Sequence, residues 1–362
     1  MLSLLPCAYS KSPAMRMMLA ILGDGRTFNW SALEGLNMGI VSVTKTNVSR
    51  ENAAKIAAQY SNSPLAAFDE LKDGYFNAAY AITLADGRKW VLKVSPPPSV
   101  RVLRYERGIL RAEVEAMRLV SEHTSVPVPA IRGVDFSHGI IPNDYFLMDF
   151  VDGVPLNKLR GVLDADKIDA IDRQVGRYLR EINAIRGTGF GYFNDPRYGT
   201  WREAFADMIT GLLDDARDAD VKLPRDIDDL QRILPTFYPL LDAVTDPVLV
   251  HWDLWDGNVF IDPETGRITG IIDFERAMWG DPLMEVNFSG MTPSLSGVGA
   301  FADGYGVDIL DTPEKRQRRA LYNVYLHFIT VIEAVYRQYE SPDMHTWAWG
   351  QLTAALDTLG IG

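Results

Sequence analysis

The polar segment His251-Trp252-Asp253-Leu254-Trp255-Asp256-Gly257-Asn258 constrains the fold of this chain more than any other feature. A second aspartate, Asp273, ends an apolar run twenty residues after Asp253. An H-x-D-x-x-x-x-N loop followed by such an aspartate provides three oxygen-bearing side chains at a specific spacing. That spacing is typical of a site that orients a hydroxyl group and holds magnesium over phosphates. The sequence therefore predicts a cleft with this loop on one wall.

Size and composition favour two lobes on either side of such a cleft. The chain has 362 residues, of which 47% are hydrophobic, and single cores rarely grow beyond roughly 250–300 residues. The net charge of -12 argues against a nucleic-acid partner, which would require clustered Lys and Arg. The single cysteine, Cys7, fits a reducing cytoplasm, and no apolar run is long enough to span a membrane. Lys11 and Arg16 interrupt the apolar bias of the first 22 residues, so we expect no secretion signal.

The first part of the chain predicts a small antiparallel sheet. Residues 1–46 show little periodicity, and we treat them as an N-terminal extension without a function. Ser49 is a good N-cap for an alanine-rich helix. Short alternating segments follow, with the hairpin signal Asp86-Gly87 between two of them, which predicts a three-stranded meander. With a further helix around 110–120 and strands at 131–135 and 145–150, residues 47–150 form the predicted N-terminal lobe.

The second part, residues 151–362, reads as a larger helical lobe that follows a linker near 149–153. Two apolar strands, 258–261 and 268–272, interrupt it around a turn and form a hairpin that carries the polar loop. The predicted fold class is α+β, with a sheet-rich N-terminal lobe and a helical C-terminal lobe. The apolar spacing predicts helices near 165–184, 201–217, 226–243 and 313–339.

Groups that suit phosphate binding lie upstream of the polar loop in a workable order. Lys93 ends an apolar strand, where a cation needs anionic partners. Glu113 on the following helix is our choice for one partner, with Glu115 ranked second. The segment around Gly74 contains one glycine, and its position before Lys93 makes the backbone amides of Phe76 and Asn77 candidate phosphate donors.

Within the polar loop each polar residue receives one role. We assign Asp253 to hydroxyl orientation and proton acceptance, and His251 to holding the loop through hydrogen bonds. Asn258 and Asp273 are the predicted magnesium ligands, because magnesium prefers hard oxygen ligands and keeps several waters. Asp281, which precedes Pro282, is read as a helix N-cap.

With these residues in place, the chain resembles the aminoglycoside phosphotransferase family, a group of protein-kinase-like enzymes that includes choline and sugar kinases. The resemblance covers about residues 49–340. It implies a two-lobed kinase-like fold, ATP or GTP in the cleft with adenine near Asp149 and Val151, and transfer of the terminal phosphate to a small-molecule hydroxyl. One departure is that many relatives have glycine where Trp252 stands. The motifs are Gly74–Asn77, Val91–Lys93, Glu113, Val126–Pro129, Met148–Gly153, His251–Asn258 and Ile272–Glu275.

The acceptor is less well defined than the reaction. From Asp253 to Glu285 there are eight acidic residues and two basic ones, which favours a cationic, aminoglycoside-like acceptor. Asp253 and Asp273 are already assigned to proton acceptance and to magnesium. Asp256 and Glu275 are then the best candidates for contact with the acceptor. Further candidates lie in the polar loop or on the predicted helix 201–217: Trp252, Trp255, Trp201 and Asp207. Packing in the core explains the tryptophans as well.

Two other classes stay open on the sequence alone. A catalytically silent, nucleotide-binding regulatory pseudokinase would share the fold, but such proteins commonly lack at least one of the five expected groups, and all are present here: Lys93, Glu113, Asp253, Asn258 and Asp273. A binuclear metallohydrolase would need more histidines near the site than this chain offers. The sequence does not define the oligomeric state.

Overall fold

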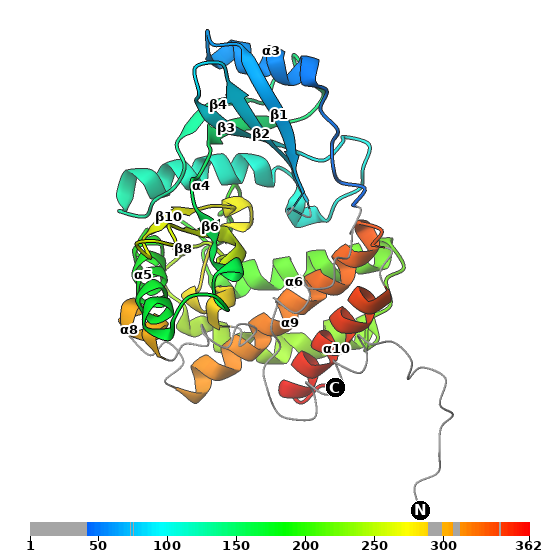
Figure 1. Ribbon diagram of the computed structural model, residues 1–362. Helices are drawn as coiled ribbons and strands as arrows, with labels where there is room; N and C mark the ends of the chain where they lie inside the picture. Colours follow the sequence, from blue (N-terminus) through cyan, green and yellow to red (C-terminus); the bar gives the residue numbers. More distant parts are fainter. Residues whose placement is uncertain (1–41, 73, 75, 289–298, 307–311, 340–341) are drawn as a thin grey trace, which may run out of the picture.

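The computed structural model describes residues 42–362 except 73, 75, 289–298, 307–311 and 340–341. Most of the predicted N-terminal extension therefore lies outside the described residues. Figure 1 shows a sheet-rich part at the top, a helical part below it, and helix α4 between them. The elements of the upper part are α3 (Arg50–Tyr60), β1 (Leu65–Leu71), β2 (Ala78–Leu84), β3 (Lys89–Val94), α4 (Ile109–His123), β4 (Ile131–Asp135) and β5 (Tyr145–Asp149).

The upper part is one antiparallel sheet of five strands in the order β1-β2-β3-β5-β4. The predicted meander is confirmed as its first three strands, and Gly87 of the predicted turn has φ +88°, a conformation that suits glycine. Strand residues alternate between two covered faces. Ile82 and Leu92 pack with α3 on one face, while Val91 and Met148 belong to the core that contains α4 on the other.

Helix α4 joins the sheet to the rest of the molecule. Its residues Val114 and Met117 are buried in a core cluster that also includes side chains of the helical part, such as Leu179 and Phe274. The backbone N–H of Ile271 donates to the carbonyl of Pro127, just after α4, at 2.7 Å. The two parts therefore share one continuous hydrophobic core.

The helical part contains the predicted hairpin and several short strands. Strand β9 pairs with β10 to form the hairpin that follows the polar loop, and β8 leads into that loop. Two small sheets of three strands have the orders β10-β9-β6 and β7-β11-β8. The elements are β6 (Val154–Pro155), α5 (Ala165–Asn183), β7 (Gly191–Tyr192), α6 (Trp201–Asp218), α7 (Ile227–Ile233), β8 (Val248–Val250), β9 (Val259–Ile261), β10 (Ile268–Ile271), β11 (Met278–Gly280), α8 (Ala300–Tyr305), α9 (Pro313–Tyr336) and α10 (Pro342–Thr358).

One helix prediction needs correction. The segment 226–243 is not a single α-helix: α7 ends at Ile233, and a 3-10 helix continues from Leu234 to Ala243. Pro235 and Pro239 explain the change, because proline lacks the N–H that an α-helix interior uses. The Ser49 N-cap of α3 and the Asp281 cap before Pro282 are confirmed by hydrogen bonds to Asn52 N and Leu283 N. Among the described residues, no helix is long and apolar enough to cross a membrane.

Candidate active site

The 251–258 loop is held at its start by a buried carboxylate. Glu285 accepts the backbone N–H groups of His251 at 2.9 Å and Trp252 at 2.8 Å. The His251 imidazole lies between two parts of the site: its Nε2 is 3.1 Å from the Ile272 carbonyl oxygen, and its Nδ1 accepts the Asp253 N–H at 3.2 Å. Burial lowers the pKa of His251 to about 4, so the ring is neutral near pH 7. A neutral imidazole with a hydrogen bond at each ring nitrogen is suited to holding the 251–258 loop in place.

The two ends of the loop are tied together by Asn258. Its Nδ2 donates to the Asp253 carbonyl oxygen at 2.8 Å, which leaves the Asn258 Oδ1 as the ligand atom of this side chain. The carboxyl group of Asp253 lies in the same loop, where burial raises its pKa to about 8 although the nearby Arg276 guanidinium opposes the shift. The proton-accepting role of Asp253 stays a prediction, and the raised pKa is compatible with it.

Trp252 adopts a backbone conformation that side chains rarely take. Its φ of +64° lies in the left-handed region, which favours glycine over residues with a large side chain. Two features hold it there: the N–H bond to Glu285, and an indole that is only 1% exposed and packs against Tyr325 with ring centroids 5.4 Å apart. The tryptophan therefore fills the core beneath the loop.

We expect Trp252→Gly to destabilise the protein by about 1–4 kcal/mol, because a cavity cost of about 3–5 kcal/mol outweighs about 1–2 kcal/mol of relieved backbone strain. Urea unfolding followed by fluorescence and circular dichroism measures the difference. Trp349→Ala is the matched control, since Trp349 is 42% exposed and should cost under about 1 kcal/mol. Equal losses for the two variants would contradict the packing role of Trp252.

Lys93 lies at the centre of a buried acidic cluster. Its Nζ is 2.8 Å from Glu113 Oε2, 2.5 Å from Asp273 Oδ1 and 2.9 Å from Glu275 Oε2. Glu115, the neighbour that the sequence ranked second, pairs with Arg118 instead. We call Lys93, Glu113, Asp273 and Glu275 the lysine cluster. With one ammonium and three carboxylates, its formal charge is -2 when all four groups are ionised.

The titration of the lysine cluster reflects this imbalance. Burial opposes the charge of Lys93, but the carboxylates outweigh it and keep the pKa of Lys93 well above its usual value. Burial also opposes ionisation of Asp273, yet the charge and hydrogen bond of Lys93 hold the pKa of Asp273 below its usual value. For Glu113 burial wins and raises the pKa to about 8 despite the neighbouring Lys93. The cluster therefore has unneutralised negative charge that a cation could balance.

The segment after β1 reaches the same cluster. Asn77 Nδ2 donates to Glu275 Oε2 at 2.6 Å, and the Phe76 ring lies under the Arg337 guanidinium at 5.1 Å. Gly74 is described between two residues that are not, so the shape of this turn stays a prediction. The sequence missed Lys45 here, whose Nζ donates to the Asn77 carbonyl oxygen at 2.6 Å. Burial lowers the pKa of Lys45 to about 8.

Thr44 and Lys45, at the end of the segment to which the sequence assigned no function, contact the backbone of Phe76 and Asn77. Thr44 Oγ1 donates to the Phe76 carbonyl at 2.8 Å, beside the Lys45 bond to Asn77. The short stretch before α3 thus binds the backbone of the segment that we expect to meet phosphates. Apart from a lone lysine in an aperiodic stretch, the sequence holds no signal for this contact, because the partners are 32 residues apart.

The predicted adenine contacts lie at the end of β5. The Asp149 carboxylate pairs with Arg132 at 2.6 Å, so its side chain faces the sheet, while its backbone N–H donates to Ala130. Val151 packs over Gly270, where a Cβ atom would meet its side chain. These contacts fix the backbone of the segment between the two parts. The nucleotide contact itself stays a prediction.

Several predicted acceptor residues have structural partners instead. The prediction for Trp201 is wrong, because this side chain is fully buried and donates to Tyr322 Oη at 2.8 Å. Asp256 is also unavailable, since it is buried in an ion pair with Arg160, whose Nη2 lies 2.7 Å from its Oδ1. Asp207 pairs with Arg197 at 3.1 Å on the surface of α6. Trp255 is half-buried, with its ring over Gly257.

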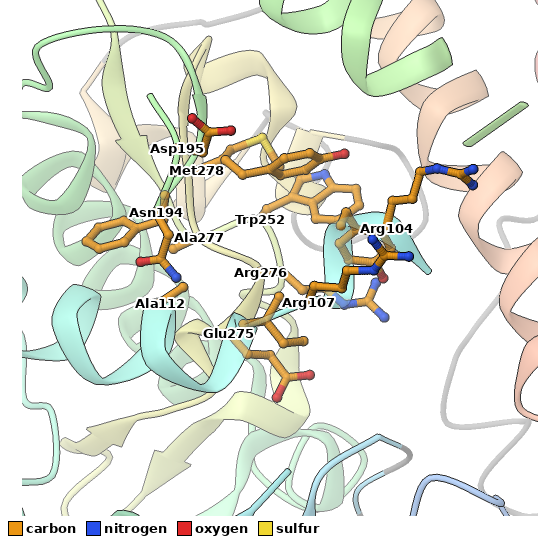
Figure 2. A pocket seen from close by; sticks show the side chains of 14 residues that line it. Arg104, Arg107, Ala112, Asn194, Asp195, Trp252, Glu275, Arg276, Ala277 and Met278 are labelled. Carbon is orange, nitrogen blue, oxygen red and sulfur yellow. The ribbon is translucent and has the colours of Figure 1, made fainter. Parts of the chain in front are cut away.

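A cavity of about 160 Å³ opens beside the 251–258 loop. We call it the arginine pocket, because Arg104, Arg107 and Arg276 line it together with Trp252. Figure 2 shows the three arginines on one side of the pocket, while the Glu275 carboxylate points away from them. In the sequence, Arg276 is one of the two positively charged residues between Asp253 and Glu285. Nothing in the sequence indicated that Arg104 and Arg107 lie near it.

Comparisons with known proteins agree with this geometry. The model of a phosphotransferase enzyme family matches residues 68–321. A provisionally assigned fructosamine-3-kinase from Thermobifida fusca is 22% identical, with a TM-score of 0.60 over 84% of this chain and 99% of that one. An aminoglycoside phosphotransferase APH(4)-Ia, crystallised with ADP and hygromycin B, is 20% identical, with a TM-score of 0.60 over 86% and 99%. At these identities the two structures show that the fold is shared.

One relative carries a name that describes a different kind of enzyme, and this chain matches only part of it. A protein of Arabidopsis thaliana named "Probable acyl-CoA dehydrogenase IBR3" is 23% identical over 227 residues, which is 60% of this chain and 27% of that protein. This chain thus spans about a quarter of that relative.

Proposed function

Because the chain belongs to the phosphotransferase enzyme family, we propose that it transfers the terminal phosphoryl group of ATP or GTP to a hydroxyl of a small molecule. The observation that carries the proposal is the lysine cluster beside the 251–258 loop. It gathers a lysine, a helix glutamate and a metal-competent aspartate next to a carboxyl whose pKa is about 8.

In the proposed reaction, the acceptor oxygen forms a bond to the terminal phosphorus while the bond from that phosphorus to the bridging oxygen breaks. The nucleoside diphosphate leaves with the electron pair. Asp253 takes the hydroxyl proton and orients the attacking oxygen. Lys93, once phosphates are bound, contacts their oxygens while Glu113 keeps it in position. Positioning and charge stabilisation provide most of the rate in such transfers.

Magnesium fits the residues that are present. Asn258 offers Oδ1 and Asp273 a carboxylate, both hard oxygen ligands, and carboxylate oxygens of Glu113, Asp273 and Glu275 lie within 4.8 Å of one another. We propose Asn258 and Asp273 as its ligands, with Glu113 and Glu275 kept on Lys93. When bound, magnesium would neutralise phosphate charge that develops during transfer.

A panel assay for magnesium-dependent release of ADP or GDP tests the proposal, with mass spectrometry of the phosphorylated product. We expect turnover with at least one hydroxyl compound among aminoglycosides, choline, amino sugars, nucleosides and macrolides, extended by hydroxy acids. Chelation of magnesium should abolish it. Nucleotide binding with no turnover on the whole panel would favour the regulatory pseudokinase instead, and absence of nucleotide binding would refute both.

A cationic, aminoglycoside-like acceptor remains a candidate within that panel. Its support was the excess of acids between residues 253 and 285, and the structure engages most of them internally. Asp256 pairs with Arg160, Asp281 with Arg318, and Glu285 holds the 251–258 loop. These contacts leave few carboxylates for a cationic ligand.

A further inference from the structure

We propose that the acceptor carries an anionic group, a carboxylate or a phosphate, which binds Arg107 and Arg276 in the arginine pocket while its hydroxyl meets Asp253. This inference rests on the proposed function, because it names the acceptor of that reaction. It reverses the charge that the sequence favoured for the acceptor.

The arginine pocket lies where an acceptor has to bind. Trp252, which lines it, directly precedes Asp253, and Glu275 forms its boundary with the lysine cluster. The Arg276 guanidinium lies 5.6 Å from the centre of the Trp252 ring and exerts the strongest charge effect on Asp253 of any neighbouring group. A ligand in this cavity therefore lies beside the loop that carries Asp253 and beside Glu275 of the lysine cluster.

The pocket has a surplus of positive charge. The Arg107 side chain is exposed at the pocket, and its guanidinium has no hydrogen-bond or ion-pair partner among the described residues. Arg276 is 15% exposed, and among the described residues its Nη2 pairs with Glu333 at 3.1 Å. Glu333 also pairs with Arg337 at 3.0 Å, and Arg337 is mainly neutralised by Glu106 at 2.7 Å. Within the described part of the chain only this Nη2 of Arg276 donates to a carboxylate, so its other N–H groups keep hydrogen-bonding capacity.

The carboxylates that line the pocket do not offset this charge. The Glu275 carboxylate points away from the arginines, where it accepts a hydrogen bond from Asn77 and pairs with Lys93. Asp195 lies at the opposite end of the pocket in Figure 2 and pairs with Arg197 at 3.2 Å. Arg104, the third arginine, is engaged by Asp215 and Asp218, so we assign the anion to the other two.

The remaining walls are apolar and fix the rest of the ligand. Tyr105, Ile109, Phe193 and Met278 line the cavity, whose volume of about 160 Å³ limits it to a small ligand. Guanidinium groups bind carboxylate and phosphate oxygens in a planar, two-point manner. The geometry therefore suits a compact hydroxy acid or a small phosphorylated alcohol better than a polycation.

A matched series of compounds tests the charge of the acceptor. 3-Hydroxyhexanoate, 1,3-hexanediol and 1-amino-3-hexanol share one carbon chain and one hydroxyl but carry negative, neutral and positive groups. We expect the acid to bind about tenfold to a hundredfold more tightly than the diol, as charge-assisted hydrogen bonds imply. Calorimetry with a non-hydrolysable ATP analogue present measures binding apart from turnover. Glycerol 3-phosphate against glycerate distinguishes a phosphate from a carboxylate as the preferred anion.

Substitutions then locate the binding group. Arg107→Gln should remove most of the preference for the acid, and Arg107→Lys should retain part of it. Arg118→Gln is the control, because Arg118 lies on the exposed face of α4, where it pairs with Glu115. Melting temperature and nucleotide affinity should stay unchanged in all three variants.

The possible results separate this inference from the proposed function. Tighter binding of the amine, or equal binding of all compounds, overturns the inference even if phosphoryl transfer occurs. A preference for the acid that survives Arg107→Gln overturns it as well. Binding of the acid that depends on Arg107, without any phosphoryl transfer, upholds the anion site and refutes the proposed function.

Discussion

Replacing Asp253 with asparagine is expected to lower kcat by a factor of about 10²–10⁴, the usual contribution of a general base. The amide retains the shape of the carboxyl but cannot take the hydroxyl proton. Nucleotide affinity should change little, because Lys93 and the metal ligands stay in place. Steady-state measurement of nucleoside diphosphate release gives kcat and KM separately. Glu264→Gln, an exposed change in the hairpin that follows the loop, is the control and should keep full activity.

The same carboxyl gives the activity a pH dependence. Burial raises the pKa of Asp253 to about 8, opposed by Arg276 and reinforced by Asp273, Glu275 and Glu333. A base must be ionised, so kcat/KM for the acceptor should rise with pH until about 8. Arg276→Gln should move this rise to higher pH, because the opposing charge is gone. A profile that is flat from pH 6 to 9 in the unmodified enzyme would contradict the assignment.

The free energy of unfolding changes with pH in the opposite direction to the activity. Asp253 binds its proton more tightly in the folded state than in the unfolded chain, where its pKa is near 3.8. The folded state therefore loses stability as the pH rises from about 4 towards 8, and no further above it. The asparagine variant should lack this part of the pH dependence in urea unfolding.

Lys93→Met is expected to lower the free energy of unfolding by about 3–5 kcal/mol, because it leaves buried carboxylates without their counter-charge. Glu113, Asp273 and Glu275 all lie within 3 Å of the ammonium. Urea unfolding measures the loss, and phosphoryl transfer should fall below detection. The matched control is Lys89→Met at the exposed start of the same strand, for which we expect less than about 1 kcal/mol. A comparably small loss for Lys93→Met would mean that the carboxylates are protonated in its absence.

The elements that the sequence predicted well are those with a strong local signal. Alternation and the Asp86-Gly87 turn were enough for the meander, and the caps at Ser49 and Asp281 set the starts of two helical segments. The prediction that 226–243 is one α-helix was wrong, because apolar spacing does not register the proline at position 239. The short strands β6, β7 and β11 were missed since two or three residues carry no periodicity.

The site shows the same division. Lys93 and Asp253 could be found because each is marked by its own segment, a strand end and a motif. The ion-pair partners of the surrounding charged residues could not be predicted, because they lie far away in the sequence. Asp256 meets Arg160 across 96 residues, and only folding brings Arg107 beside Arg276. Counting acids along the chain therefore could not show that Asp256 is already paired or that three arginines line the pocket.

The lysine cluster has a thermodynamic consequence for the order in which ligands bind. The surplus carboxylates would repel the phosphates of a nucleotide that arrives without a metal, and they would attract a metal ion. A bound metal ion would remove this repulsion, and bound phosphates would add oxygen ligands for the metal. Metal and nucleotide binding then form one linked equilibrium, in which each raises the affinity for the other by the same factor.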